Sequence, residues 1–236
     1  MNFHLDSACT YGLRASLLVC ALFAGVSLFS ACKKEANPGM QHDPLVHRFE
    51  HASDWTGQLD APDRVAWQKP AELVAFMNIT PGMKVADIGA GTGYFLPYLS
   101  RAVGENGEVL GLDIEPDMVR HMKERAEREG LQNVTPRLVD GDNPGLADHS
   151  VDRVLIVDTW HHIPDRERYA ARLARVLAPG GAVYLVDYTM TSPHGPPGAH
   201  RIAPDAAAKE MASAGLLTEI DTDILPEQYV VIARAP

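Results

Sequence analysis

Glycines at alternate positions follow an apolar segment, and a carboxylate ends the next apolar segment along the chain. The glycines are Gly89, Gly91 and Gly93, and the carboxylate is Asp113. Glycine lets the backbone turn sharply and lets a ligand approach the main chain closely. A carboxylate at the end of a second strand can accept hydrogen bonds from ribose hydroxyls. Together these residues predict a binding site for a cofactor that carries an adenosine group.

Two classes of cofactor share this logic, and the spacing of the glycines separates them. Dinucleotide-binding loops use the pattern G-x-G-x-x-G, in which the third glycine seats a helix beside the pyrophosphate. In this chain Tyr94 stands at that third position, so the spacing is G-x-G-x-G. Asp87, which precedes the loop, suits a ligand with a cationic ammonium group and repels a diphosphate. An oxidoreductase that uses a nicotinamide dinucleotide is the weaker alternative.

Such a site needs a scaffold that brings the ends of separate strands together, and the apolar segments predict one. We expect strands at 84–88, 108–112, 133–139, 151–157, 182–187, 217–223 and 228–233, and helices at 70–77, 94–103, 115–129, 167–177 and 205–214. Strands that alternate with helices predict an α/β fold, a mostly parallel sheet with helices on both faces. Ligands bind such sheets beyond the carboxyl ends of the strands, where the strand order reverses.

Residues 62–236 resemble a class I S-adenosylmethionine-dependent methyltransferase. The motifs that carry the resemblance are, in chain order, Asp87–Gly93, Leu112–Pro116, Asp140–Asp142 and Leu177–Gly181. The first resembles the family's glycine motif and the second its ribose-binding motif. The third falls where the family places a polar residue against the adenine amino group. The fourth resembles the turn before the family's fifth strand.

The resemblance implies a fold, a cofactor and a set of cofactor-binding residues. The fold is a Rossmann-like, seven-stranded, mostly parallel sheet with helices on both faces and a reversed last strand, for which 228–233 fits. The cofactor is S-adenosyl-L-methionine. The residues expected to bind it are Asp87, Gly89, Gly91, Gly93, Asp113, Ile114 and Asp142.

Candidate catalytic residues follow the fourth expected strand. They are Asp158, His161 and His162, in the segment where the family places residues on the acceptor side. Methyl transfer mainly requires that nucleophile and methyl group be held close and aligned. A general base is needed only when the acceptor must lose a proton, and histidine can serve near neutral pH. The alternative is that one histidine packs in the interior while the other lines the cleft wall.

Composition narrows the range of partners. The chain has 236 residues, a net charge of -10 and 7% aromatic residues, which argues against nucleic acid as a partner. A pattern formed by Arg64, Trp67 and Pro70 together with 158–162 resembles a bacterial subgroup that acts on small molecules. We therefore expect a small-molecule acceptor, and no protein partner is inferred. Cysteine is absent after Cys32, which argues against arsenite as the acceptor because arsenite methylation needs thiol ligands.

A metal site is not predicted, although several candidate ligands follow the fourth and fifth strands. Asp187, His194 and His200 could join Asp158 and His161 in a site of oxygen and nitrogen ligands. Hard cations, however, require several oxygen ligands in one place, and these residues are rich in histidine and irregularly spaced. The loop around His194 is expected to be a lid over the acceptor site instead.

The N-terminus reads as an export signal. Arg14 precedes the apolar run 15–29, which has the length of a signal-peptide core and is too short for a comfortable membrane span. The small residues before Cys32 resemble a bacterial lipobox, so we expect a signal peptide over 1–32 and possible membrane attachment through a lipidated Cys32. Residues 33–61 would be a tether that becomes an N-terminal lid, and 62–236 the methyltransferase domain. If the signal is not used, the protein is cytoplasmic.

Two function hypotheses follow. The first is S-adenosylmethionine-dependent methyl transfer to an unidentified small molecule. Because S-adenosylmethionine is made and kept inside cells, the export signal conflicts with it. The second hypothesis is an exported, lipid-anchored binding protein on the periplasmic face of a bacterial membrane, which keeps the fold without catalysis.

Overall fold

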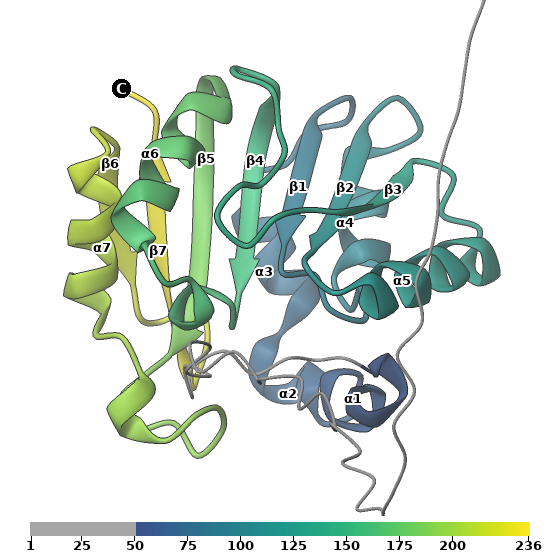
Figure 1. Cartoon of the computed structure of the whole chain (residues 1–236), viewed down its shortest axis with the longest axis horizontal. Coiled ribbons are helices and arrows are strands. Elements are labelled where there is room, and N and C mark those ends of the chain that lie inside the picture. Colours follow the sequence, from purple (N-terminus) through teal and green to yellow (C-terminus); the bar gives the residue numbers. More distant parts are fainter. Residues whose placement is uncertain (1–50) are drawn as a thin grey trace, which may run out of the picture. The chain divides into compact units, whose positions relative to one another are not determined.

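A seven-stranded sheet forms the centre of the computed structural model, which describes residues 51–236 (Figure 1). The strands are β1 (Lys84–Ile88), β2 (Glu108–Asp113), β3 (Val134–Leu138), β4 (Val151–Val157), β5 (Leu177–Tyr188), β6 (Leu217–Asp221) and β7 (Gln228–Arg234). Their order is β3-β2-β1-β4-β5-β7-β6. Strands β1 to β5 are parallel, and β7 is antiparallel to both of its neighbours. The predicted sheet with a reversed last strand is confirmed.

The helices begin and end where the sequence provides the appropriate residues. They are α1 (Ala52–Leu59), α2 (Arg64–Gln68), α3 (Pro70–Phe76), α4 (Leu96–Val103), α5 (Pro116–Glu129), α6 (Arg166–Val176) and α7 (Pro204–Ser213), with short 3-10 turns η1 (Trp160–His162) and η2 (Gly198–His200). Proline occupies the first turn of α3, α4, α5 and α7, where the missing N–H has no helical partner to lose. Gly130 ends α5 in the left-handed conformation that glycine adopts most easily.

Strand β4 shows why both faces of the sheet must be covered. Val154 and Ile156 belong to the core beneath α6 and α7. Leu155 and Val157 point to the other face, into a second core with α3, α4 and α5. Because side chains alternate along a strand, an uninterrupted apolar segment buries both faces at once. The two layers of helices follow from that pattern.

Two local features differ from the expectations. Strand β5 begins at Leu177, which pairs with Val151, and after a register shift the ladder resumes at Arg153 and Ala182. The turn expected over 177–181 is therefore an irregular start of β5, because β5 advances five residues from Leu177 to Ala182 while β4 advances two, and three extra residues are accommodated between the paired positions. Helix α1 lies within the segment 33–61, which we expected to be a tether that becomes an N-terminal lid and for which no helix was predicted. Its single buried residue is Ala52, so it carries little apolar periodicity for a sequence pattern to detect.

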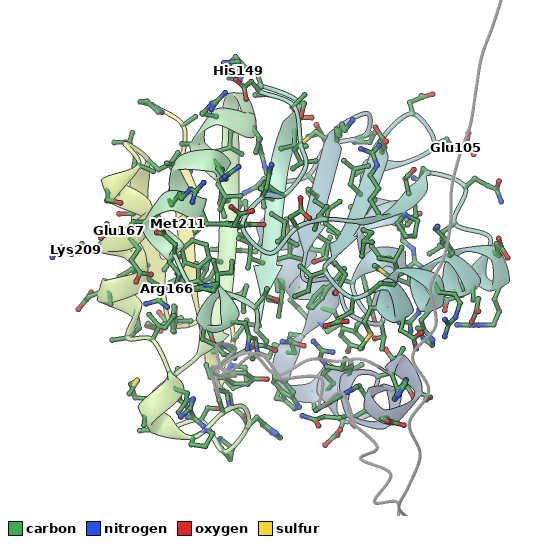
Figure 2. All side chains as sticks on the ribbon, viewed as in Figure 1. Glu105, His149, Arg166, Glu167, Lys209 and Met211 are labelled. Atoms are coloured by element: carbon green, nitrogen blue, oxygen red, sulfur yellow. The ribbon has the colours of Figure 1, made fainter. Side chains whose placement is uncertain are left out.

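Helices α1 and α2 lie at the carboxyl edge of the sheet, the end toward which β4 points in Figure 1. The side chain of Asp60, just after α1, accepts hydrogen bonds from the hydroxyl of Thr92 at 2.9 Å and from Arg125 at 3.0 Å. Figure 2 shows Glu105 and His149 at the opposite edge. The N-terminal helices therefore cover the edge where ligands bind in sheets of this type.

The N-terminal predictions lie outside the described residues. These are the signal peptide 1–32, the lipidation site Cys32 and the tether up to residue 50. Within residues 51–236, none of the helices has the length and apolar character needed to cross a membrane.

Gly93 is predicted to be more sensitive to alanine substitution than Gly130. Both have positive φ, 79° and 67°. A Cβ on Gly93 would lie 2.6 Å from Cδ1 of Leu96, whereas one on Gly130 would have no neighbour within 4 Å. We expect Gly130→Ala to lower the free energy of unfolding by about 1–2 kcal/mol through backbone strain. Gly93→Ala should lose about 1–3 kcal/mol more through overpacking. Urea unfolding measures both, and equal losses would show that Leu96 relaxes without cost.

Candidate active site

The glycine loop between β1 and α4 adopts backbone angles that suit glycine. Gly89, Gly91 and Gly93 have φ values of 68°, 57° and 79°. A Cβ on Gly89 would lie 2.3 Å from Oγ1 of Thr159, so this loop sits directly against the residues that follow β4. The predicted cofactor glycines thus lie at the β1/β4 junction, where the strand order reverses.

Asp113, the last residue of β2, holds this loop in place. Its Oδ2 accepts a hydrogen bond from the backbone N–H of Gly91 at 2.8 Å, and its Oδ1 accepts one from Glu115 at 2.9 Å. Burial raises the pKa of Asp113, and these backbone donors oppose the rise. Each carboxylate oxygen has a second lone pair, so Asp113 can still accept hydrogen bonds from ribose hydroxyls.

The residues expected to contact adenine are only partly brought together. Ile114, next to Asp113, keeps 49% of its surface exposed. The loop after β3 passes beside it, since a Cβ on Gly141 would lie 4.0 Å from Cγ2 of Ile114. The carboxylate of Asp142, however, is exposed and lies 3.4 Å from Arg172 on α6. Its backbone is thus near the site while its side chain contacts α6, and its cofactor role stays a prediction.

Asp87 is a buried carboxylate with an unused oxygen. The residue is 2% exposed, and none of the residues described here donates a hydrogen bond to its Oδ2. Loss of solvation is the main cause that raises its pKa to about 7, and the negative charge of Asp113 adds to the rise. The positive charge of Arg64 opposes it. An oxygen in this state favours a cationic hydrogen-bond donor.

Arg64, the first residue of α2, is held on several sides. Its Nε donates to the side chain of Gln68 and its Nη1 to the carbonyl of Leu59. Its guanidinium carbon lies 4.2 Å from the ring centroid of Tyr94, a cation–π distance. Its Nη2 lies 4.0 Å from Oδ2 of Asp158. The sequence pattern that contains Arg64 indicated a subgroup and gave no role to this residue.

Asp158, just after β4, sits in a network of amide and hydroxyl donors. Its Oδ2 accepts from Gln68 at 3.1 Å and from the hydroxyl of Tyr188 at 3.0 Å, and its Oδ1 accepts from Gln228. Loss of solvation raises the pKa of Asp158 to about 6, against the opposing charge of Arg64. The network joins α2 to the ends of β4, β5 and β7, and sequence patterns did not indicate Gln68 or Gln228.

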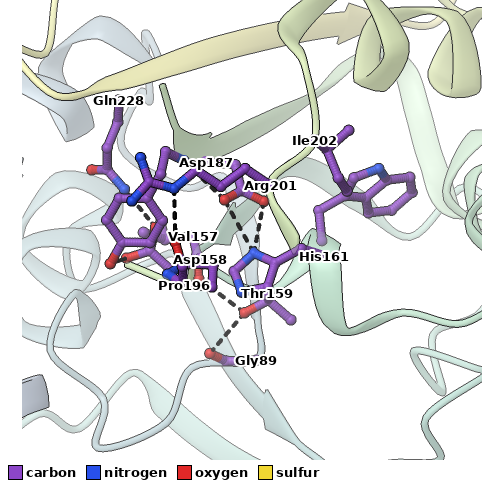
Figure 3. Close-up of polar contacts among 12 residues, drawn as sticks. Gly89, Val157, Asp158, Thr159, His161, Asp187, Pro196, Arg201, Ile202 and Gln228 are labelled. Atoms are coloured by element: carbon purple, nitrogen blue, oxygen red, sulfur yellow. Dashed lines mark hydrogen bonds and ion pairs between the residues drawn. The ribbon is translucent and has the colours of Figure 1, made fainter. Parts of the chain in front are cut away.

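His161 forms a dyad with Asp187, the residue before the last of β5 (Figure 3). Its Nδ1 lies 3.1 and 3.0 Å from the two carboxylate oxygens, and Oδ1 also accepts from the backbone N–H of Tyr188. Because a carboxylate accepts hydrogen bonds, the neutral ring carries its proton on Nδ1 and presents Nε2 as an acceptor. The ring of His162 stacks at a tilt on His161, with centroids 4.2 Å apart.

The 3-10 turn η1, which carries both histidines, is anchored from the core. Trp160 is fully buried, and its Nε1 donates to Glu210 on α7 at 2.7 Å. Arg166, labelled in Figure 2, donates to the same carboxylate at 2.9 Å. Trp160 is therefore a packing residue, and its anchoring fixes the position of His161.

The loop after β5 forms one wall of this region. Arg201 donates to the carbonyls of Thr189, Ser192, His194 and Pro196 at 2.8–2.9 Å and so fixes the loop backbone. The ring of His194 stacks on Trp67 of α2 at 4.5 Å. The loop expected to act as a lid thus contacts the N-terminal helices.

Candidate metal ligands are not gathered into a cluster. Within residues 51–236, no group of three or more His, Cys, Asp or Glu side chains could hold a metal ion. His194 lies 3.2 Å from Glu227, and Asp187 is engaged by His161.

Comparisons with known proteins add the family context. A family model for a methyltransferase domain matches residues 85–181. An arsenite methyltransferase of Halobacterium salinarum is 28% identical over 162 residues, which cover 69% of this chain and 41% of that protein. A demethylmenaquinone methyltransferase of Anoxybacillus flavithermus is 34% identical over 149 residues, which cover 60% and 61%. The chain therefore spans about half the length of the curated relatives it matches.

Solved structures resemble the fold more completely. A SAM-dependent methyltransferase from Aquifex aeolicus superposes with a TM-score of 0.74 at 26% identity, covering 78% of this chain and 98% of that one. The predicted fold class is thereby confirmed. Residues 85–181, set in this seven-stranded sheet, match a methyltransferase domain, and this match supports the predicted enzyme class.

Proposed function

We propose that this protein transfers a methyl group from S-adenosylmethionine to a small-molecule acceptor. The observation that carries the proposal is the placement of Asp87, the glycine loop and Asp113 together at the β1/β4 junction of a matched methyltransferase domain. The sheet brings these groups together from separate strands, as a ligand with a ribose and an ammonium group requires.

The residues present fit this cofactor. The unpartnered Oδ2 of Asp87 suits the ammonium of the methionyl group, and Asp113 suits the ribose hydroxyls. A side chain on Gly89 would collide with Thr159, so glycine is needed there for the loop to pack against the segment after β4. Ile114 offers an exposed apolar surface for the adenine, and Asp142 would contribute from the neighbouring loop.

The acceptor is proposed to be a small molecule by analogy with the relatives. Two of them are named for demethylmenaquinone and nocamycin, and one for arsenite. The described part of this chain has no cysteine, so it lacks the thiols that would bind arsenite. An organic acceptor is therefore preferred, and its wall would include Trp67, Tyr188 and His194.

His161 is proposed as the general base for an acceptor that must lose a proton. S-adenosylmethionine, when bound, supplies a methyl group on a sulfonium sulfur that leaves readily. The chain's task is to align the acceptor with that group and to take its proton at Nε2 of His161. Asp187 holds the ring and stabilises the positive charge that the ring then carries. His162 packs on this ring, and Asp158 anchors α2 beside it.

The site of action in the cell rests on residues outside the described range. Membrane attachment through Cys32 and a periplasmic location stay predictions from the N-terminal sequence. An exported protein would also need a supply of S-adenosylmethionine outside the cytoplasm.

Removing the carboxylate of Asp113 should weaken cofactor binding. Calorimetric titration of S-adenosylhomocysteine should show binding to the wild-type protein. We expect Asp113→Ala to lose about 1.5–3 kcal/mol of binding free energy, the scale of hydrogen bonds to charged groups. Asp148→Ala, which removes an exposed carboxylate paired with Arg175, is the matched control and should bind like the wild type. Unchanged affinity in Asp113→Ala would show that the ribose assignment is wrong.

Cofactor affinity should rise with pH through the titration of Asp87. With its pKa raised to about 7, this carboxyl is largely neutral at about pH 6 and ionised at about pH 8. Only the ionised form pairs with an ammonium group, so S-adenosylhomocysteine should bind more tightly at the higher pH. Asp87→Asn should flatten this rise. Asp158, whose pKa is about 6, is present in both proteins. Its titration therefore contributes equally to both and cancels in the comparison.

The raised pKa of Asp87 also determines how the stability of the ligand-free fold changes with pH. Because the folded pKa of Asp87 lies above the unfolded value of 3.8, the ligand-free fold loses stability as pH rises from about 4 to about 7. Asp87→Asn should therefore melt at a higher temperature than the wild type at about pH 8, and the gain should shrink at about pH 5. A lower melting temperature for Asp87→Asn at the higher pH would contradict the burial argument.

The dyad predicts the tautomer of His161. In ¹H–¹⁵N spectra of the neutral ring, the Nδ1–H form should dominate, because Asp187 accepts that proton. His161→Gln identifies the signal by removing it. Asp187→Asn should reduce the preference, since an amide can also donate to Nδ1. A dominant Nε2–H form in the wild type would exclude Nε2 as the base.

A further inference from the structure

Arg64 is a buried cation that serves two carboxylates on different strands. Its residue exposure is 8%, and its charge lowers the pKa of both Asp87, in β1, and Asp158, just after β4. Asp87 belongs to the proposed cofactor side and Asp158 to the acceptor side. The guanidinium therefore lies in the electric field of both, at the end of the sheet that α2 covers.

Two of the three guanidinium nitrogens are committed to the N-terminal helices. Nε donates to Gln68 and Nη1 to the carbonyl of Leu59, while the Tyr94 ring supports one face of the group. Nη2 lies 4.0 Å from Asp158, which is longer than a hydrogen bond. The guanidinium is thus held in orientation and retains N–H donors on Nη2 for an anion.

The charges of this region match an amino acid attached to a sulfonium. When ionised, Asp87 and Asp158 together with Arg64 sum to one negative charge. The reactive end of S-adenosylmethionine carries a sulfonium, an ammonium and a carboxylate, which sum to one positive charge. With Asp87 taking the ammonium, the carboxylate needs a cation nearby, and a planar guanidinium suits a carboxylate best.

We propose that Arg64 binds the carboxylate of the methionyl group of S-adenosylmethionine, so that helix α2 completes the cofactor site from the N-terminal side. This inference rests on the proposed function. It assigns recognition of the methionyl carboxylate to a segment outside the matched range 85–181. The amino-acid end of the cofactor would then bind as a zwitterion between Arg64 and Asp87.

The alternative is that Arg64 only clamps α2 onto the domain. An arginine that only holds α2 and an arginine that binds the cofactor carboxylate differ in one measurable respect. Loosening α2 would weaken every cofactor analogue to the same extent, whereas losing a carboxylate partner would weaken only analogues that have the carboxylate. The test therefore compares two ligands on the same protein, S-adenosylmethionine and its decarboxylated form, which keeps the sulfonium and the amine.

Both ligands are titrated calorimetrically into the wild type, Arg64→Gln, Arg64→Lys and Arg101→Gln. The wild type should bind S-adenosylmethionine roughly 10- to 100-fold more tightly than the decarboxylated form, as expected for a charge-assisted hydrogen bond. In Arg64→Gln this ratio should fall to within about threefold, and Arg64→Lys should lie between, because lysine keeps the charge without the fork. Arg101→Gln removes an exposed arginine of α4 and should keep the wild-type ratio.

The outcomes distinguish a failure of the proposed function from a failure of the role assigned to Arg64. If the wild type binds neither ligand, the proposed function fails. If it binds both and Arg64→Gln keeps the wild-type ratio, Arg64 is a clamp and the inference is overturned. If Arg64→Gln is partly unfolded, as circular dichroism would show, both affinities fall by the same factor, so the ratio of the two affinities still decides. A ratio in a folded Arg64→Lys above that of Arg64→Gln supports the proposal, because lysine keeps the positive charge, and a ratio no higher than that of Arg64→Gln shows that charge alone does not hold the carboxylate.

Discussion

Burying carboxylates at the carboxyl edge of the sheet is the constraint on which the site depends. Asp87 is buried and the side chain of Asp158 keeps 19% of its surface exposed, so each loses solvation when ionised, and that loss raises the pKa of each. Such groups persist only where a partner or a ligand compensates them. Asp158 has amide and hydroxyl donors, whereas Oδ2 of Asp87 has none among the described residues. Asp87 is therefore the carboxylate whose buried charge would need a hydrogen-bond donor from a ligand.

Compensation for Asp158 comes from both the sheet, through Tyr188 and Gln228, and the N-terminal helix α2. Gln68 and Arg64 both belong to α2, and α1 is tied to the domain through the neighbouring Asp60. Removing these helices would take away the Gln68 donor and the Arg64 charge, both of which favour the ionised form of Asp158. The N-terminal helices are therefore part of the site's electrostatics as well as its cover.

The sequence patterns predicted the sheet well because its strands follow local rules. The apolar runs of β1 and β4 and the glycine loop carry their signal within a few residues, and the structure places them as expected. Helices α1 and α2 were missed because tertiary contacts hold them rather than an apolar stripe. The start of β5 was missed because residues 177–181 contain the proline and glycines of a turn, and only pairing with Val151 makes them a strand.

The candidate site was predictable to the same degree. Asp113 and the glycines could be found because a fixed spacing joins them, and the contact between Asp113 and Gly91 bears out that spacing. Gln68 and Gln228 could not, since they meet Asp158 across 90 and 70 residues of chain. For Asp142 the motif indicated a loop that does lie beside Ile114. It could not indicate that Arg168 and Arg172 of α6 would contact the carboxylate.

The network also distinguishes the roles of the residues after β4. Both oxygens of Asp158 already accept hydrogen bonds from neighbouring side chains, so this carboxylate has little capacity left for an acceptor's proton. His161 is different, because Asp187 occupies only Nδ1 and the opposite nitrogen can accept. Under the proposed function, a proton leaving the acceptor would therefore go to His161, while Asp158 would hold α2 in position. The hydrogen bonds that each side chain already makes are what favour this assignment of proton transfer to one residue and positioning to the other.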